Sequence, residues 1–197
     1  MSEVITTELL GQHPALQNIA TKENLTASWI RGTDGFIGFG EWRTTTVKGA
    51  NRFEDARKWW RNQLNDLKIV NDVHGFGTGP ILFTSFTFDP DDESKLVIPK
   101  IVIAHKENKS WITWIGENPT ISEDEEKFDS VKVAFKTGAL SDDEWKDRVA
   151  TAVKHIKAGE LEKVVLARDL IADASDELPI RKLIQTLISN YPTTWTF

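Results

Sequence analysis

The stretch Gly159–Arg168, with the sequence GELEKVVLAR, is the most informative part of the chain for the fold. The run from Lys163 to Ile171 is mostly apolar and rich in valine, which predicts a β-strand. Alternate side chains of a strand point to opposite faces, so Lys163 shares a face with Val165 while Arg168 lies on the other. A lysine among small apolar groups can be desolvated, which disfavours the ammonium form and makes the amine usable as a base. The alternative is an ordinary solvent-facing lysine.

Helices are predicted on both sides of this stretch. Ser141 and Glu144 have the spacing of a capping box, and apolar residues then recur at helical spacing up to Ile156. A second helix is predicted over 178–189, with Leu183, Leu187 and Ile188 facing inward. The last residues, 194–197, resemble the start of another strand, so we expect the chain to be a truncated form of a larger domain.

The first 130 residues predict mainly strands. Apolar and glycine-punctuated runs predict strands over 29–42 and 81–88 and a hairpin of 96–104 with 111–115, while 52–67 predicts a helix. The acidic segment at about 117–130 predicts a solvated connector. Together these elements predict an α+β fold, an antiparallel sheet packed with helices.

Two common functional motifs are disfavoured. The glycines at 75, 77 and 79 precede Pro80 and a predicted strand, whereas a phosphate-binding loop leads into a helix. The four histidines share no metal-ligand spacing. We therefore interpret the glycine cluster as a tight connection between strands and predict no metal ligands or cofactor-binding residues in this chain.

The composition narrows the class of protein. The 197 residues include 40% hydrophobic and 27% charged residues, which is typical of a globular protein. The net charge of −6 disfavours a nucleic-acid surface. The chain has no cysteine, and no apolar run is long enough to span a bilayer. We expect a protein without a membrane or nucleic-acid partner, located in the cytoplasm.

At Gly159–Arg168 the sequence resembles the chorismate-utilising enzymes. These carry a helix, then G-x-x-x-K/Q-V-V-x-x-R, then a helix ending near Tyr-Pro, then a strand. The matching segments here are Trp145–Ile156, Gly159–Arg168, Tyr191-Pro192 and Trp195–Phe197. Upstream, Gly79–Asp89 and Leu96–Pro99 resemble the N-terminal sheet of isochorismate synthases, so the resemblance extends from about Gly75 to the end.

The resemblance implies a specific reaction. Family members that add ammonia usually have Gln at the position of Lys163, and those that add water have Lys, which acts as the general base. Lys163 therefore implies isochorismate synthase, an isomerase in which water attacks C2 of chorismate while the C4 hydroxyl leaves. The resemblance also implies a glutamic acid that protonates the leaving oxygen and a magnesium ion that binds the substrate carboxylate.

The family's acid and its magnesium ligands follow the segments matched here, and none of the acidic residues of this chain takes their place. We thus expect residues 1–197 to be the N-terminal part of a single chorismate-utilising domain, inactive alone, with a parent enzyme that serves menaquinone or siderophore biosynthesis. The alternatives are a salicylate synthase, which adds pyruvate elimination, and a non-catalytic fragment or pseudo-enzyme.

Overall fold

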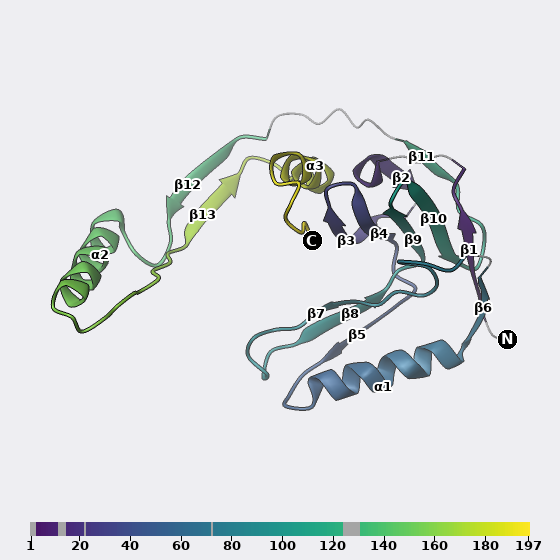
Figure 1. The fold of residues 1–197 in the computed structure, drawn as a ribbon, viewed down its shortest axis with the longest axis horizontal. Helices are drawn as coiled ribbons and strands as arrows, with labels where there is room; N and C mark the ends of the chain where they lie inside the picture. Colours follow the sequence, from purple (N-terminus) through teal and green to yellow (C-terminus); the bar gives the residue numbers. More distant parts are fainter. Residues whose placement is uncertain (1–2, 12–14, 22, 72, 124–130) are drawn as a thin grey trace. The chain divides into compact units, whose positions relative to one another are not determined.

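The structure, a computed structural model, describes residues 3–11, 15–21, 23–71, 73–123 and 131–197. The chain divides into two compact units (Figure 1). Unit 1 comprises residues 1–126 and 180–197, and unit 2 comprises residues 127–179. Strands and helices are both present, which confirms the predicted α+β class.

A six-stranded sheet forms the centre of unit 1, with the order β3-β4-β9-β10-β1-β6. All its neighbouring strands are antiparallel except β1 and β6, which are parallel. Two smaller sheets have the orders β5-β8-β7 and β11-β2. The strands are β1 (Glu3–Leu9), β2 (Ile19–Thr21), β3 (Leu25–Arg31), β4 (Asp34–Phe39), β5 (Arg43–Val47), β6 (Leu67–Asn71), β7 (Phe83–Ser85), β8 (Ser94–Ile98), β9 (Ile101–Lys106), β10 (Lys109–Ile115) and β11 (Ile121–Glu123).

The predicted hairpin is confirmed as β9 and β10. Its turn contains Glu107 and Asn108 at φ 51° and 64°, the left-handed conformation that a tight two-residue hairpin loop requires. The strand predicted from residue 96 divides into β8 and β9 at Pro99. The prediction of a buried strand over 81–88 is wrong for most of its length. Only β7 forms there, at the edge of its sheet, and Phe88 is fully exposed.

Three helical elements belong to unit 1: η1 (Leu16–Asn18), α1 (Arg52–Asn65) and α3 (Ile180–Asn190). The predicted helices over 52–67 and 178–189 are therefore confirmed. In α3, however, Ile184 and Ile188 are the buried residues, whereas Leu183 and Leu187 are 42% and 44% exposed. The inward face predicted from Leu183 and Leu187 is wrong. The helix α3 has apolar residues on two adjoining faces, and it packs through the face that carries Ile184 and Ile188.

The core of unit 1 joins α3 and η1 to one face of the large sheet. Its buried side chains come from η1, β2, β3, β4, β9, β10 and α3: Leu16, Ile19, Ile30, Ile37, Phe39, Ile101, Ile103, Ile112, Trp114, Ile184 and Ile188. The segment predicted as a strand over 194–197 makes one bridge, in which Ile30 and Thr196 exchange backbone hydrogen bonds of 2.9 and 2.7 Å. The C-terminal segment thereby pairs with β3.

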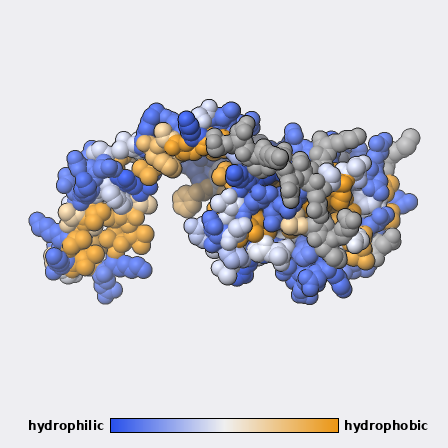
Figure 2. Space-filling model, turned by 90° about the horizontal axis from the view of Figure 1, so that it is seen from above, coloured by the Kyte–Doolittle hydropathy of each residue, from blue (hydrophilic) through white to orange (hydrophobic). Residues whose placement is uncertain are grey.

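Unit 2 contains β12 (Val133–Thr137), α2 (Asp142–Lys157) and β13 (Leu170–Ala174), with β12 and β13 antiparallel. None of its described side chains is buried. Phe135 is 70% exposed, and Figure 2 shows hydrophobic residues gathered on the surface around α2. The acidic connector predicted at about 117–130 lies partly outside the described residues, and within it β11 pairs with β2.

Candidate functional site

The helix α2 begins where its capping box predicts. The Ser141 hydroxyl accepts a hydrogen bond from the Glu144 backbone N–H at 3.3 Å, and the Glu144 carboxylate accepts one from the Ser141 N–H at 2.8 Å. The Ser141 hydroxyl also donates to the Glu144 carboxylate at 2.7 Å, and this hydrogen bond, followed by the one from the Ser141 backbone N–H, holds the pKa of Glu144 below its ordinary value. The start of α2 is thereby fixed relative to the residues that precede it.

The helix also ends where the sequence predicts. Gly159 has a φ of +75°, and the Glu160 N–H donates to the His155 carbonyl at 3.0 Å. A left-handed glycine with this backward hydrogen bond is a common way to terminate a helix. The side chains of His155 and Glu160 also form a hydrogen bond. From Glu160 the chain turns back towards the first turn of α2.

The segment 161–169 carries Lys163 along this return path. It is not a β-strand: β13 begins at Leu170, so the strand predicted from Lys163 is wrong over its first seven residues. The physical reason is that a strand needs a hydrogen-bonded neighbour, and β12 pairs only with residues 170–174. Lys163 is exposed, so the desolvation expected from its apolar neighbours is not found in this chain.

Arg168 is the least exposed residue of the same segment. Its guanidinium donates to the Asp142 carboxylate at 2.7 Å and lies 5.9 Å from the centre of the Trp145 ring. The Arg168 side chain is 22% exposed. Sequence analysis did not identify this pair, because no local pattern relates an arginine to the carboxylate it contacts across a helix.

The next residue makes a second anchor. The Asp169 carboxylate accepts the Ala139 backbone N–H, with oxygen distances of 3.0 and 3.2 Å. A Cβ atom at Gly138 would overlap this carboxylate. Asp169 therefore contacts the chain just before α2, beside a glycine whose missing side chain leaves room for the carboxylate.

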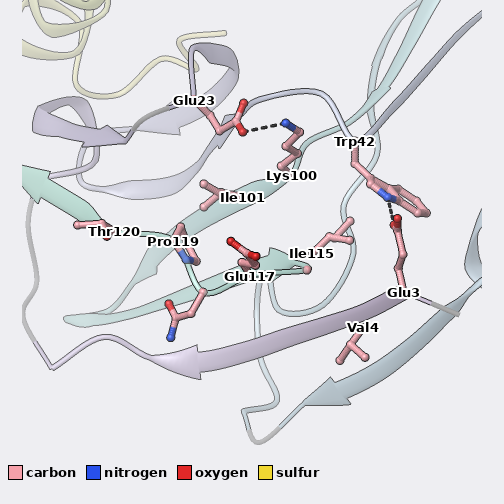
Figure 3. Close-up of a pocket in the computed structure, with 12 residues that line it drawn as sticks. Glu3, Val4, Glu23, Trp42, Lys100, Ile101, Ile115, Glu117, Pro119 and Thr120 are labelled. Carbon is pink, nitrogen blue, oxygen red and sulfur yellow. Dashed lines mark hydrogen bonds and ion pairs between the residues drawn. The ribbon is translucent and has the colours of Figure 1, made fainter. Parts of the chain in front are cut away.

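Unit 1 contains a cavity of about 620 Å³, shown in Figure 3. Its charged lining residues are Glu3, Glu23, Glu117 and Lys100. Glu23 pairs with Lys100 at 2.8 Å, and the Trp42 indole N–H donates to Glu3. Three carboxylates face one ammonium group, so the cavity disfavours an anionic ligand.

No magnesium site is found among the described residues, where no group of three or more His, Cys, Asp or Glu side chains converges. Hard divalent cations need several oxygen ligands arranged around them. The described residues therefore do not fit a magnesium ion, and no reaction step involves one here. The acidic run from Asp124 to Glu126 lies outside the described residues. No helix in the described ranges is long and apolar enough to cross a membrane.

A family model described as chorismate binding enzyme matches residues 4–197. The chain belongs to the chorismate binding enzyme family. The match begins well before Gly75, so the family resemblance extends over nearly the whole chain. This membership confirms the family that the sequence around Lys163 indicated.

Two proteins with established similarity to this chain illustrate the relationship. The chain is similar to isochorismate synthase MenF from Bacillus subtilis (strain 168), with 23% identity over 78% of this chain and 39% of MenF. It is also similar to a crystal structure from Bacillus anthracis described as a putative 2,3-dihydroxybenzoate-specific isochorismate synthase, DhbC. That match has a TM-score of 0.51 and 21% identity, and covers 89% of this chain and 39% of DhbC. The chain thus shares part of the fold of the DhbC structure and spans about two fifths of the length of each of these two proteins.

Proposed function

We propose that this chain is the Lys163-bearing part of an isochorismate synthase, an isomerase that converts chorismate to isochorismate. The observation that carries the proposal is a lysine at position 163 in a member of the chorismate binding enzyme family. A primary amine can take a proton from water, whereas the glutamine of ammonia-adding relatives cannot. The relatives described above support the same activity.

In the proposed reaction, the Lys163 amine removes a proton from water as the water oxygen bonds to C2 of chorismate. Both ring double bonds shift, from C1=C2 to C1=C6 and from C5=C6 to C4=C5, and the C4–oxygen bond breaks. A proton donor outside this chain converts the departing hydroxyl to water. We propose that a magnesium ion would be held by glutamates outside this chain, where it would offset the charge of the substrate carboxylate. The product serves menaquinone or siderophore biosynthesis, and we expect the reaction to occur in the cytoplasm.

The acidic cavity of unit 1 does not compete with this assignment. Chorismate is an anion, and the lining of that cavity includes three carboxylates with its one lysine already paired to Glu23. Lys163, in contrast, is an exposed cation, whereas Arg168 of the same segment is paired with Asp142. We therefore place the chemistry at the Lys163 segment of unit 2.

The decisive experiment uses a polypeptide that combines this chain with the remainder of the family domain. Lys163→Gln preserves the approximate length and polarity of the side chain and removes the base. We expect kcat for isochorismate formation to fall by about 10²–10⁴-fold, with a smaller change in KM. Lys157→Gln, which removes a lysine from the end of α2, is the matched control and should retain activity.

Product analysis by chromatography completes the experiment. Isochorismate as the end product supports the proposal, and salicylate with pyruvate would identify a salicylate synthase instead. A folded Lys163→Gln protein with near-normal kcat would show that Lys163 is not the base. The 197-residue chain alone should show no turnover above the uncatalysed background.

A further inference from the structure

After α2 the chain returns towards the start of the helix, where Arg168 makes its contact. The helix has 16 residues and is therefore about 24 Å long. Arg168 contacts Asp142, the first residue of α2, so the chain from Glu160 must travel back along the whole helix. The eight residue steps from 160 to 168 can span at most about 26–29 Å when fully extended. The chain bends at Glu160 and Glu162, and the Arg168 and Asp142 side chains bridge part of the distance, so residues 163–168 cover the remainder as an open segment that lacks the pairing of a β-strand.

An extended segment alternates its side chains between two sides. The observed exposure agrees: Val164 is 38% exposed, Val165 81% and Leu166 39%. Arg168 continues the less exposed series, and its guanidinium contacts α2. The even-numbered residues from 164 to 168 therefore face α2. Lys163, an odd number of residues from Arg168, faces away from the helix.

We propose that Arg168 is a positioning residue: its contact with Asp142 and Trp145 holds the segment extended along α2 and thereby directs Lys163 away from the helix. Asp169 reinforces this contact by accepting the Ala139 N–H, and Gly159 fixes the other end of the segment. Lys163 and Arg168 are an odd number of positions apart, which places the two side chains on opposite sides. The importance of that direction for catalysis rests on the proposed function of Lys163.

The direction of the side chains can be measured without enzymatic activity. The chain has no cysteine, so a single introduced cysteine gives a uniquely placed nitroxide label. We would attach the label at Lys163→Cys, Val164→Cys or Val165→Cys and record the broadening of the backbone amide signals of α2. Labels at 163 and 165 should broaden these signals weakly, and the label at 164 should broaden them strongly.

Arg168→Gln should abolish the difference in broadening between the label at 164 and the labels at 163 and 165, while the amide signals of α2 itself remain. Asp142→Asn removes the same pair from the other side and should have the same effect. Exchanging the charges in Arg168→Asp with Asp142→Arg should restore the contrast. Arg148→Gln is the matched control, because it removes an arginine of α2 that makes no contact with the segment in the described interactions, and it should leave the contrast unchanged.

Other outcomes would overturn the proposal. If the contrast persists in Arg168→Gln and Asp142→Asn, the pair does not orient the segment. If both variants lose the α2 signals, the pair holds unit 2 together and does not specifically direct Lys163. Failure of Lys163→Gln to reduce activity would refute the proposed function and leave the measured contrast intact, so the two proposals fail separately.

Discussion

The packing of α3 against the rest of unit 1 provides a quantitative test of the fold, because the helix has two apolar faces and only one of them is buried. Ile188→Ala removes three carbon atoms from a side chain that is 7% exposed. At about 0.8 kcal/mol for each buried carbon, the transfer contribution is about 2.4 kcal/mol. The cavity left behind increases this loss, so we expect the free energy of unfolding of unit 1 to fall by about 2.5–4 kcal/mol.

The matched control is Leu187→Ala, which also removes three carbon atoms but from a side chain that is 44% exposed. We expect a loss of about 1 kcal/mol, because little area is uncovered and no enclosed cavity forms. Urea unfolding followed by tryptophan fluorescence reports mainly on unit 1, since every tryptophan except Trp145 lies there. Equal losses in the two variants would refute the packing of α3 through Ile188.

Three further predictions concern backbone geometry, pH and metal binding. Gly35→Ala should lower the melting temperature of unit 1 sharply, because Gly35 has a φ of 142° and a Cβ atom there would overlap the Trp29 carbonyl. The control is Gly49→Ala: Gly49 has a φ of 86° with open space around it, so this change should lower the melting temperature far less. The capping box lowers the pKa of Glu144, so its stabilisation of α2 is present above the ordinary glutamate pKa and is lost as the pH falls through the lowered value. Amide hydrogen exchange of α2 should accelerate in that pH range. Glu144→Gln should remove this pH dependence of the exchange. Calorimetric titration of this chain with magnesium should show no saturable site tighter than about millimolar, and stoichiometric tight binding would contradict the absence of a ligand cage among the described residues.

Features determined by neighbouring residues could be predicted from the sequence. The capping box required only Ser141 and Glu144, and the turn between β9 and β10 required only a short polar segment between two apolar runs. In both cases the interacting groups are close in the chain, so residue type and spacing contain the necessary information. The position of Lys163 in a recognisable motif was local information of the same kind.

Features that depend on distant partners could not be predicted. Residues 163–169 have the composition of a strand, but no described strand pairs with them. The Arg168–Asp142 contact and the bridge between Ile30 and Thr196 join segments whose proximity depends on the whole fold. The choice between the two apolar faces of α3 likewise depends on the surface it packs against, which helical periodicity does not specify.

The exposure of Lys163 connects the fold of unit 2 to the chemistry proposed for it. A lysine acts as a base when burial disfavours its ammonium form, yet unit 2 buries none of its described side chains. In the same unit Phe135 is 70% exposed and Val165 is 81% exposed. Exposed apolar side chains of this kind often mark a surface that another part of a protein covers. A covering surface would remove these side chains from water and desolvate the amine together with them. The catalytic role proposed for Lys163 therefore requires a surface that covers this part of unit 2, and Arg168 would keep the amine directed to the side on which that cover must lie.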